Sequence, residues 1–396
     1  MNKSLDAIIA GHLCLDFFPD LTKYKPGVFI KRLLPGKLLN VGSAYFSTGG
    51  PVSNTGQALH VLGMKVRLLG KIGEDEFGQI IRKVINQQDP SLTESLIVSN
   101  VEGTSYTIIL NPPGIDRVFL HFTGTNDTFN ADDINSQFIS QAKLFHFGYP
   151  PLMRKMYVDS GKYLSELMRK AKESKVITSL DMALPDPNSD AGRANWLAII
   201  KRTLPYVDLF LPSVEEITYM INRSLYEKLI SKTANRNILP FIEPQHLSKL
   251  SKTLLNFGAK IVVFKLGERG LYVRTQNADS LAELSSCISF DLLNWSSREI
   301  WAPCFRVNVV GTTGAGDATV AGFLASFIKG LNIEEAIQMA TAVGACCVEE
   351  LDAISGIKSW ELTQKRITSG WKRHTMHIQD SKWIFDKQFY QWEKRE

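Results

Sequence analysis

Short, continuous apolar runs recur through the middle of the chain, at Leu144–Phe147, Val176–Leu180, Leu209–Leu211 and Ile261–Leu266. Runs of this kind are typical of strands that are buried on both faces of a sheet. Segments with a helical spacing of apolar residues separate them. The alternation predicts an α/β fold, in which helices flank a mainly parallel central sheet on both faces.

Two segments nearer the N-terminus have a different pattern. Phe29–Thr48 mixes β-branched and aromatic residues with Gly and Pro, and Ser105–Phe122 is β-rich around the turn sequence Asn111-Pro112-Pro113-Gly114. The first segment predicts short strands and the second predicts a hairpin. Together they predict a small β-sheet that is separate from the central one.

The remaining segments give weaker signals. Arg223–Pro244 is polar and irregular, and Ser280–Val307 lacks a clear period, so both are interpreted as insertions or edge elements. The charged, Trp-rich tail at 371–396 is expected to pack onto the body. We therefore predict one domain over residues 1–370, followed by a C-terminal extension.

Composition narrows the classes of function. The 396 residues are 44% hydrophobic and 21% charged, which is ordinary for a chain that folds around a large core. The net charge of +5, without a run of like charges, argues against nucleic acid as a partner. The five cysteines lack CxxC spacing, which favours reduced thiols over disulfides or structural zinc. Because no apolar stretch reaches the roughly eighteen residues of a membrane span, we expect no membrane partner and a cytoplasmic location.

The most informative segment is Val309–Thr319, which reads Val-Val-Gly-Thr-Thr-Gly-Ala-Gly-Asp-Ala-Thr. It predicts an apolar strand that turns through glycines into a helix. One apolar face of that helix, ended by Gly330, is formed by Val320, Phe323, Leu324, Phe327 and Ile328. Exposed backbone N–H groups and a partial positive charge make the helix start at Gly314–Asp317 a predicted anion site. The segment matches neither a Walker A loop nor the dinucleotide fingerprint.

The same segment resembles the C-terminal signature of the ribokinase-like (PfkB) family of carbohydrate and nucleoside kinases, Asp-Thr-x-Gly-Ala-Gly-Asp. It departs from the signature only at Gly311, which stands in place of the Asp. The resemblance implies that Gly314, Ala315 and Gly316 form an anion hole for the transferring phosphate. It also implies that Asp317 is the catalytic base, and that ATP and Mg²⁺ take part.

A second match lies at Gly49-Gly50-Pro51-Val52-Ser53-Asn54, followed by Gly73-Glu74-Asp75-Glu76-Phe77-Gly78. It resembles the N-terminal signature of the family, which implies that Gly49 and Gly50 admit the sugar and that Asn54 binds its hydroxyl groups. A plain helix N-cap is the alternative for Asn54. Asp16 occupies the place after the first strand where relatives bind two substrate hydroxyls, and an exposed loop Asp is the alternative.

Two further elements resemble parts of the nucleotide-binding site in that family. Pro212-Ser213-Val214-Glu215-Glu216 is similar to its Asn-x-x-Glu element, which implies that Glu216 helps to organise magnesium; a solvated Glu is the alternative. The loop from Lys265 through Gly267 to Gly270 is similar to the family's ATP-side loop. His12 and His146 lack a visible metal partner and are interpreted as hydrogen-bonded structural histidines.

The predicted function is therefore ATP-dependent phosphorylation of a hydroxyl group on a small sugar-like substrate, within a ribokinase-like fold. A nucleoside kinase of the same fold and a non-catalytic relative that binds nucleotide or sugar remain alternatives. The predicted small sheet is expected to act as a lid. An apolar lid face formed by Phe119, Leu120 and Phe122 is expected either to cover the substrate or to pair two subunits in a homodimer. The missing Asp at Gly311 predicts weak activation by potassium.

Overall fold

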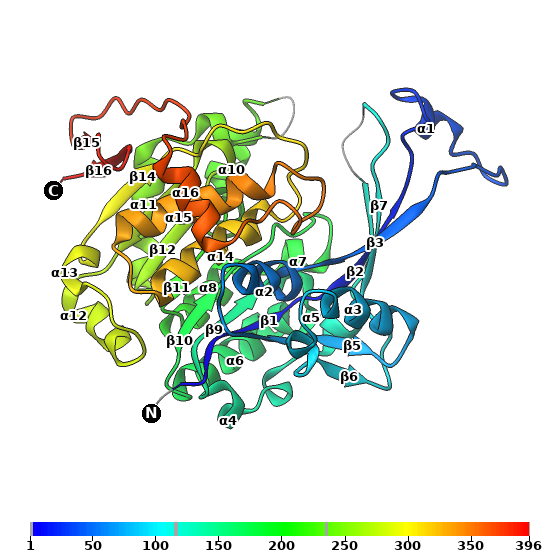
Figure 1. Cartoon of the computed structure of the whole chain (residues 1–396), viewed down its shortest axis with the longest axis horizontal. Helices are drawn as coiled ribbons and strands as arrows, with labels where there is room; N and C mark the ends of the chain where they lie inside the picture. Colours follow the sequence, from blue (N-terminus) through cyan, green and yellow to red (C-terminus); the bar gives the residue numbers. More distant parts are fainter. Residues whose placement is uncertain (1–2, 115–117, 234–236, 396) are drawn as a thin grey trace.

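The computed structural model describes residues 3–114, 118–233 and 237–395. Its main element is a ten-stranded sheet with the order β15-β16-β14-β13-β12-β11-β10-β9-β1-β4 (Figure 1). Its strands are β1 (Leu5–Gly11), β4 (Val66–Leu69), β9 (Ala142–Gly148), β10 (Ile177–Leu180), β11 (Leu209–Phe210), β12 (Ile261–Lys265), β13 (Leu271–Thr275), β14 (Glu299–Ala302), β15 (Trp383–Asp386) and β16 (Gln391–Lys394). The six strands from β12 to β4 are parallel, and the other four pair antiparallel. The predicted mainly parallel sheet is confirmed.

Helices cover both faces of this sheet because its strands are apolar on both sides. In β1, Ala7 and Ile9 belong to one hydrophobic core, whereas Ile8 and Ala10 belong to the other. The first core is covered by α2 (Pro51–Val61), α3 (Glu76–Asn86), α12 (Ala278–Leu281), α13 (Leu292–Trp295), α14 (Ala315–Ile328), α15 (Ile333–Cys347) and α16 (Trp360–Thr368). The second is covered by α4 (Ser136–Ile139), α5 (Arg154–Tyr157), α6 (Lys162–Glu173), α8 (Trp196–Thr203), α9 (Val214–Ile221), α10 (Arg223–Ile230) and α11 (Pro244–Asn256). The short helix α7 (Asp190–Arg193) precedes α8.

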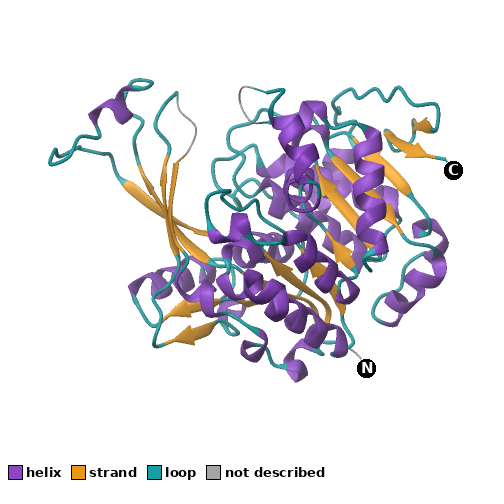
Figure 2. Cartoon of the chain, turned by 180° about the vertical axis from the view of Figure 1, so that it is seen from behind, coloured by secondary structure: helices purple, strands orange, loops and turns teal. Residues whose placement is uncertain are grey.

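A second sheet, the one predicted to act as a lid and called the lid below, projects from the body, as Figure 2 shows. Its order is β3-β2-β7-β8, from the strands β2 (Cys14–Pro19), β3 (Ala44–Gly49), β7 (Tyr106–Leu110) and β8 (Val118–Phe122). The predicted hairpin is confirmed as β7 and β8, although part of its turn lies outside the described residues. The prediction of strands over Phe29–Thr48 is wrong except at its end, because helix α1 (Val28–Arg32) and loops precede β3. A two-stranded sheet of β5 (Lys71–Gly73) and β6 (Ile97–Ser99) lies beside the lid.

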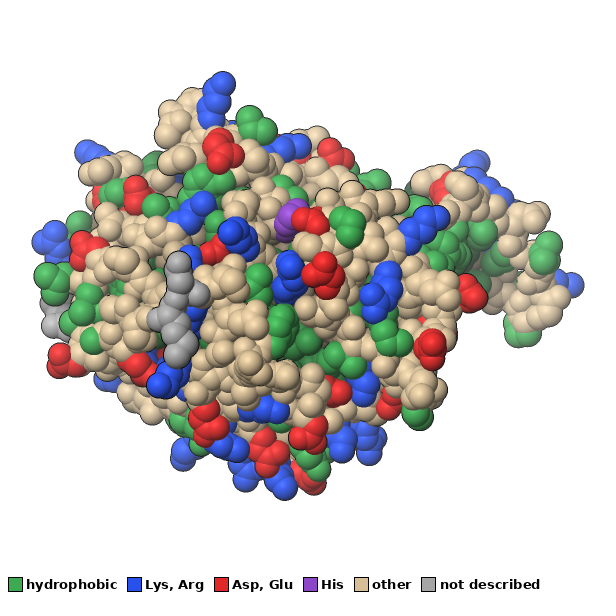
Figure 3. All heavy atoms as spheres, turned by 60° about the horizontal axis from the view of Figure 1, so that its bottom comes forward, with side chains coloured by type: hydrophobic (Ala, Val, Ile, Leu, Met, Phe, Trp, Pro, Cys, Tyr) green, Lys and Arg blue, Asp and Glu red, His purple; other side chains and the backbone are tan. Residues whose placement is uncertain are grey.

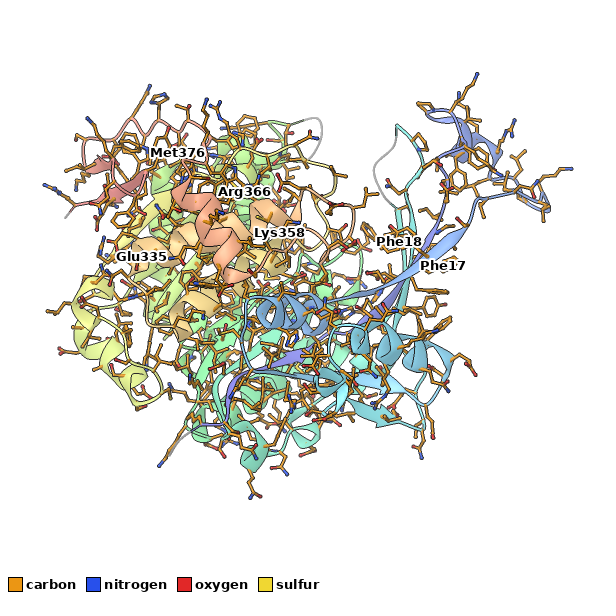
Figure 4. All side chains as sticks on the ribbon, viewed as in Figure 1. Phe17, Phe18, Glu335, Lys358, Arg366 and Met376 are labelled. Carbon is orange, nitrogen blue, oxygen red and sulfur yellow. The ribbon has the colours of Figure 1, made fainter. Side chains whose placement is uncertain are left out.

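The two faces of the lid differ in character. Strand pairing puts Asp16 opposite Thr107, and Thr107 opposite His121, so these polar residues share one face. Phe17 and Phe18 are neighbours on β2 and therefore project to opposite faces (Figure 4). The predicted apolar face is split in the same way, since Phe119 lies on the face of His121 and its neighbour Leu120 lies on the other.

Three segments with weak sequence signals form regular structure. Ser280–Val307 contains β14, which lies inside the main sheet between β13 and β16 rather than at an edge. Arg223–Pro244 contains α10, with 234–236 outside the described residues. The tail packs onto the body as predicted, since β15 and β16 extend the sheet beyond β14. The domain boundary at residue 370 stays a prediction.

Within the described ranges, no helix is long and apolar enough to cross a membrane. All five cysteines are free thiols, and Cys14, Cys346 and Cys347 are buried. Positive and negative side chains are interspersed over the body on the face drawn in Figure 3.

Candidate active site

Helix α14 lies against α2 and α15, and Tyr149, which directly follows β9, reaches its first turn. Its N-cap is Gly314, whose φ of 74° lies in the left-handed region that glycine tolerates, and whose added Cβ would lie 2.3 Å from the Cβ of Ala353. The predicted helix is confirmed and ends before Gly330, but nearly all of it is buried, not one face. The predicted strand before it is wrong: Val309 and Val310 are 58% and 49% exposed and belong to a loop.

Asp317 lies in the first turn of α14 and is 2% exposed. Asn54 Nδ2 donates a hydrogen bond to its Oδ2 at 2.9 Å, and the Tyr149 hydroxyl donates one to its Oδ1 at 2.9 Å. Thr55 Oγ1 lies 3.4 Å from Oδ1. Asn54 is not the N-cap of α2, because Gly50 holds that position and Asn54 lies within the first turn. The N-cap alternative is therefore wrong.

These contacts hold Asp317 in a fixed orientation while burial alters its chemistry. Burial raises the pKa of Asp317 above its ordinary value, although the hydrogen bonds from Asn54, Tyr149 and Thr55 and the nearby Lys265 ammonium oppose the rise. A carboxylate with a raised pKa accepts a proton more readily than one in water. Its position at a helix start places it next to the partial positive charge of α14.

The lid contributes Asp16, which lies on β2 next to the Gly49-Gly50 pair. A Cβ added to Gly49 would lie 2.4 Å from Asp16 Oδ2. A Cβ added to Gly50 would lie 2.4 Å from the carbonyl oxygen of His12. The glycines thus let the lid and the start of α2 approach closely. Asp16 is 8% exposed, so the alternative of an exposed loop residue is wrong. Burial raises its pKa to about 6, with the Cys14 thiol donating to Oδ1 at 3.3 Å.

The two histidines singled out from the sequence behave differently. His146 Nδ1 pairs with Ser179 Oγ at 2.9 Å, as predicted for a structural histidine, and burial lowers its pKa to about 3. His12 is 2% exposed, but neither of its ring nitrogens has a hydrogen-bond partner among the described residues. The prediction that His12 is a hydrogen-bonded structural residue is therefore wrong.

On the other side of Asp317 lies a buried ion pair. Lys265, the last residue of β12, donates from Nζ to Asp181 Oδ1 at 2.5 Å. Its side chain also lies next to Gly316, where an added Cβ would be 3.8 Å from Nζ. Burial on its own lowers the pKa of Lys265, but the carboxylates of Asp181, Glu216 and Asp317 together raise it. The lysine is therefore a fixed positive charge beside the start of α14.

Glu216 lies at the start of α9 and forms a capping box with Ser213. Its Oε2 accepts from the Ser213 backbone N–H at 2.7 Å, and its own N–H donates to Ser213 Oγ at 3.2 Å. Burial raises the pKa of Glu216. Glu216 is partly exposed in the first turn of α9, as the alternative of a Glu on an N-terminal helical turn states, and its charge also acts within the group formed by Lys265, Asp181 and Asp317.

The residues suit a hydrated magnesium ion that is shared with phosphates, but they do not form a complete metal cage. In residues 3–114, 118–233 and 237–395, no three acidic, cysteine or histidine side chains are grouped as metal ligands. Asp181 Oδ2 is buried without a hydrogen-bond partner, however, and Glu216 supplies a second carboxylate nearby. Magnesium prefers such oxygen ligands and usually retains several waters.

The predicted nucleotide loop follows β12 directly. Gly267 begins a short 3-10 turn, and Gly270 ends it with a φ of 87°. An added Cβ at Gly270 would lie 2.0 Å from the carbonyl oxygen of Ala302. At Gly311, an added Cβ would lie 2.8 Å from the carbonyl oxygen of Glu350, so the side chain that the family signature implies has no room in this conformation.

Among the predicted site residues, the structure brings Asn54, Lys265 and Glu216 together around Asp317 at the start of α14. It also adds two residues that the sequence analysis missed. Tyr149 follows β9 with a left-handed φ of 61° and reaches Asp317 from 168 positions away. Asp181 directly follows the predicted strand Val176–Leu180. A polar residue at the carboxyl end of a parallel strand is a usable signal, because ligands bind at that edge of α/β sheets. Tyr149 has no comparable local signal.

Comparison with known proteins bears on the family and the fold. Residues 20–360 match the model of the pfkB family of carbohydrate kinases. The chain is 24% identical to fructokinase-2 of Oryza sativa over 90% of this chain and 92% of that protein. It is 23% identical to 5-dehydro-2-deoxygluconokinase of Clostridium beijerinckii, over 92% and 94%. Fructokinase of Xylella fastidiosa with bound ATP is similar in structure, with a TM-score of 0.67 at 18% identity, over 93% and 99% of the two chains. These matches confirm the resemblance and the ribokinase-like fold.

Proposed function

The chain belongs to the pfkB family of carbohydrate kinases, and from this premise we propose that it transfers the γ-phosphoryl group of ATP to a hydroxyl group of a small sugar, with Asp317 as the general base. The observation that supports this proposal is the setting of Asp317, which accepts a hydrogen bond from Asn54 and lies in the same helix start as Gly316, next to Lys265. In the proposed reaction, Asn54 and Asp16 belong to the acceptor side, and the start of α14 with Lys265 belongs to the phosphate side.

The base acts on the acceptor hydroxyl. An acceptor bound under the lid donates a hydrogen bond to Asp317, which takes the proton as the oxygen attacks phosphorus. Asn54 and Tyr149 hold the two carboxylate oxygens, so the base is oriented before the acceptor arrives. Asp317 and Asp16 are both nearly buried, so the acceptor reaches them only after local rearrangement.

The groups on the phosphate side neutralise the negative charge of the transferring phosphoryl group. Backbone N–H groups at Gly314, Ala315 and Gly316 together with the helix dipole face the transferring phosphoryl group, whose charge is spread over its oxygens in the transition state. Lys265 next to Gly316 adds a full positive charge at the same place. These groups are the anion hole in the proposed reaction.

The nucleotide lies along the loop formed by Lys265, Gly267 and Gly270. Magnesium, when bound, neutralises the phosphate oxygens and orients the γ-phosphoryl group. Glu216 and Asp181 are the residues that would hold it through their carboxylate oxygens and its waters. Lys265 limits the repulsion between these carboxylates in the resting protein.

The proposal includes a homodimer that forms through the lid. Its outer face, away from Asp16, carries exposed Phe46, Leu120 and Phe122, at 43%, 51% and 45% exposure, and hydrophobic side chains are visible on the projecting lid in Figure 3. Such a face can pair with its own copy around a twofold axis. Leu120→Lys should lower the sedimentation coefficient to that of a monomer. Leu362→Lys, on exposed α16, is the matched control and should leave it unchanged.

The proposed activity is tested by an ADP-release screen across sugars, sugar acids, sugar phosphates and nucleosides, with ATP and magnesium saturating. Acceptor-dependent release with a sugar is expected. Release with nucleosides alone would favour the nucleoside kinase. Absence of release with every acceptor would favour a non-catalytic binding protein, a role against which the retained Asp317 argues.

A further inference from the structure

A row of polar side chains on the lid faces the acceptor site. Asp16, Thr107 and His121 lie directly opposite one another on three neighbouring strands. Thr107 Oγ1 and His121 Nδ1 are 3.0 Å apart. The ring of His12 lies 5.3 Å from that of His121 and 6.4 Å from that of Tyr149, which itself contacts Asp317. His12 therefore lies between the lid row and the base.

His12 has hydrogen-bonding capacity that the described protein does not use. Both ring nitrogens are buried and lack a partner. Leaving a buried polar group unpaired costs free energy, so a ligand that pairs with the ring stabilises this arrangement. A neutral imidazole has one donor and one acceptor, and a hydroxyl group is the partner that matches either one.

Two acidic residues and two histidines are among the titratable groups that border this space. Asp16 and Asp317 carry carboxyl groups, and burial lowers the pKa of both His12 and His121, which favours the neutral form of each ring. Across the described part of the chain, no lysine or arginine forms an ion pair or a hydrogen bond with Asp16, Asp317, His12 or His121. Lys265 is paired with Asp181 on the phosphate side.

We propose that the acceptor is an uncharged polyhydroxyl sugar and that His12 binds its hydroxyl groups. This inference rests on the proposed kinase function and narrows its substrate class. Ionised Asp16 and Asp317 only accept hydrogen bonds, so they require donors from the ligand. A sugar acid or sugar phosphate would instead bring a negative charge toward two carboxylates, and the cation near Asp317, Lys265, is already paired with Asp181.

The test separates binding from turnover. Wild-type protein holding a non-hydrolysable ATP analogue and magnesium is titrated calorimetrically with neutral probes, D-fructose, D-ribose and myo-inositol, and with anionic probes, D-gluconate and fructose 6-phosphate. At least one neutral probe is expected to bind at least about tenfold more tightly than either anion. Stronger binding of an anion, or binding of no neutral probe, overturns the inference.

Variants of His12 test its role. His12→Leu removes both ring nitrogens and should raise the acceptor KM by at least about tenfold, with the ATP KM within about twofold of wild type. His12→Asn keeps one donor and one acceptor and should recover most of the loss. His246→Leu, a matched change on the partly exposed helix α11, should change neither constant. Melting temperatures identify a variant that has lost its fold.

The outcomes also separate this inference from the proposed function. Turnover of a sugar acid with an unchanged acceptor KM in His12→Leu would leave a kinase but overturn the role of His12. Binding of a neutral sugar without ADP release would support the acceptor class while contradicting the kinase. A loss in His12→Leu that His12→Asn fails to recover, at unchanged melting temperature, would also contradict hydrogen bonding by the ring.

Discussion

The hydrogen bond from Tyr149 to Asp317 gives the sharpest test of how the base is tuned. Tyr149 donates to Oδ1 at 2.9 Å, and this bond stabilises the charged carboxylate. Tyr149→Phe removes only the hydroxyl, so the ring and the left-handed backbone are kept. The charged form of Asp317 loses a donor, and its pKa should therefore rise further.

The size of the rise follows from the contact. A buried hydrogen bond to a charged group contributes about 1.5–3 kcal/mol, and one pKa unit corresponds to about 1.4 kcal/mol. Because Asp317 is 2% exposed, solvent does little to compensate. The pKa of Asp317 should rise by about one to two units, while the bond from Asn54 to the other oxygen remains.

The assay is kcat/KM for the acceptor from about pH 5 to about pH 9, since its acid limb reports groups of the free enzyme. The limb should move to higher pH by about one to two units in Tyr149→Phe. Tyr157→Phe, in a helix without contact to Asp317, is the matched control and should not move it. An acid limb within about 0.3 units of wild type would refute the proposed tuning.

Three further predictions concern the acceptor side, the ion pair and the cation. Asp16→Ala should raise the acceptor KM at least about tenfold, because the acceptor loses its contact with a buried carboxylate. Lys265→Met should lower the free energy of unfolding by about 3–5 kcal/mol, because Asp181 is left buried without its partner, and Lys265→Met/Asp181→Leu should recover part of that loss in urea titrations. With Gly311 in place of an acidic ligand, initial rates in potassium and tetramethylammonium salts should differ by less than about twofold.

Each of these three predictions would be contradicted by a specific outcome. Equal weakening of acceptor and ATP binding in Asp16→Ala would indicate general damage rather than a lost acceptor contact. A double variant as unstable as Lys265→Met would show that the lost stability does not come from the unpaired carboxylate. A rate about tenfold lower without potassium would show that backbone oxygens alone build the cation site.

The sequence allowed prediction of those features whose signal is local. The start of α14 was predictable because Gly314 and Gly316 precede a helical period, and the buried parallel strands were predictable from their length and composition. Strand β2 was missed because it follows β1 after only His12 and Leu13, so one apolar stretch contains two strands in different sheets. The exposed Val309 and Val310 show the opposite error, since apolar character alone does not make a strand.

Contacts between distant segments explain the other omissions. Tyr149 reaches Asp317 only because β9 ends beside the start of α14, and no spacing along the chain encodes that meeting. The pairing of β16 with β14 is equally remote, and a charged, Trp-rich tail has no strand alternation that predicts it. His12 was misassigned because a satisfied histidine and an unsatisfied one look the same in sequence.

The central claim is that Asp317 is the base in phosphoryl transfer, and Asp317→Asn tests it most directly. The amide keeps the shape of the side chain and leaves the backbone at Gly314–Gly316 intact, but it cannot accept the proton. With the acceptor found in the screen, acceptor-dependent ADP release should fall at least about a hundredfold, while the calorimetric Kd for ATP stays within about twofold of wild type. A variant that retains more than about a tenth of wild-type turnover would contradict the claim.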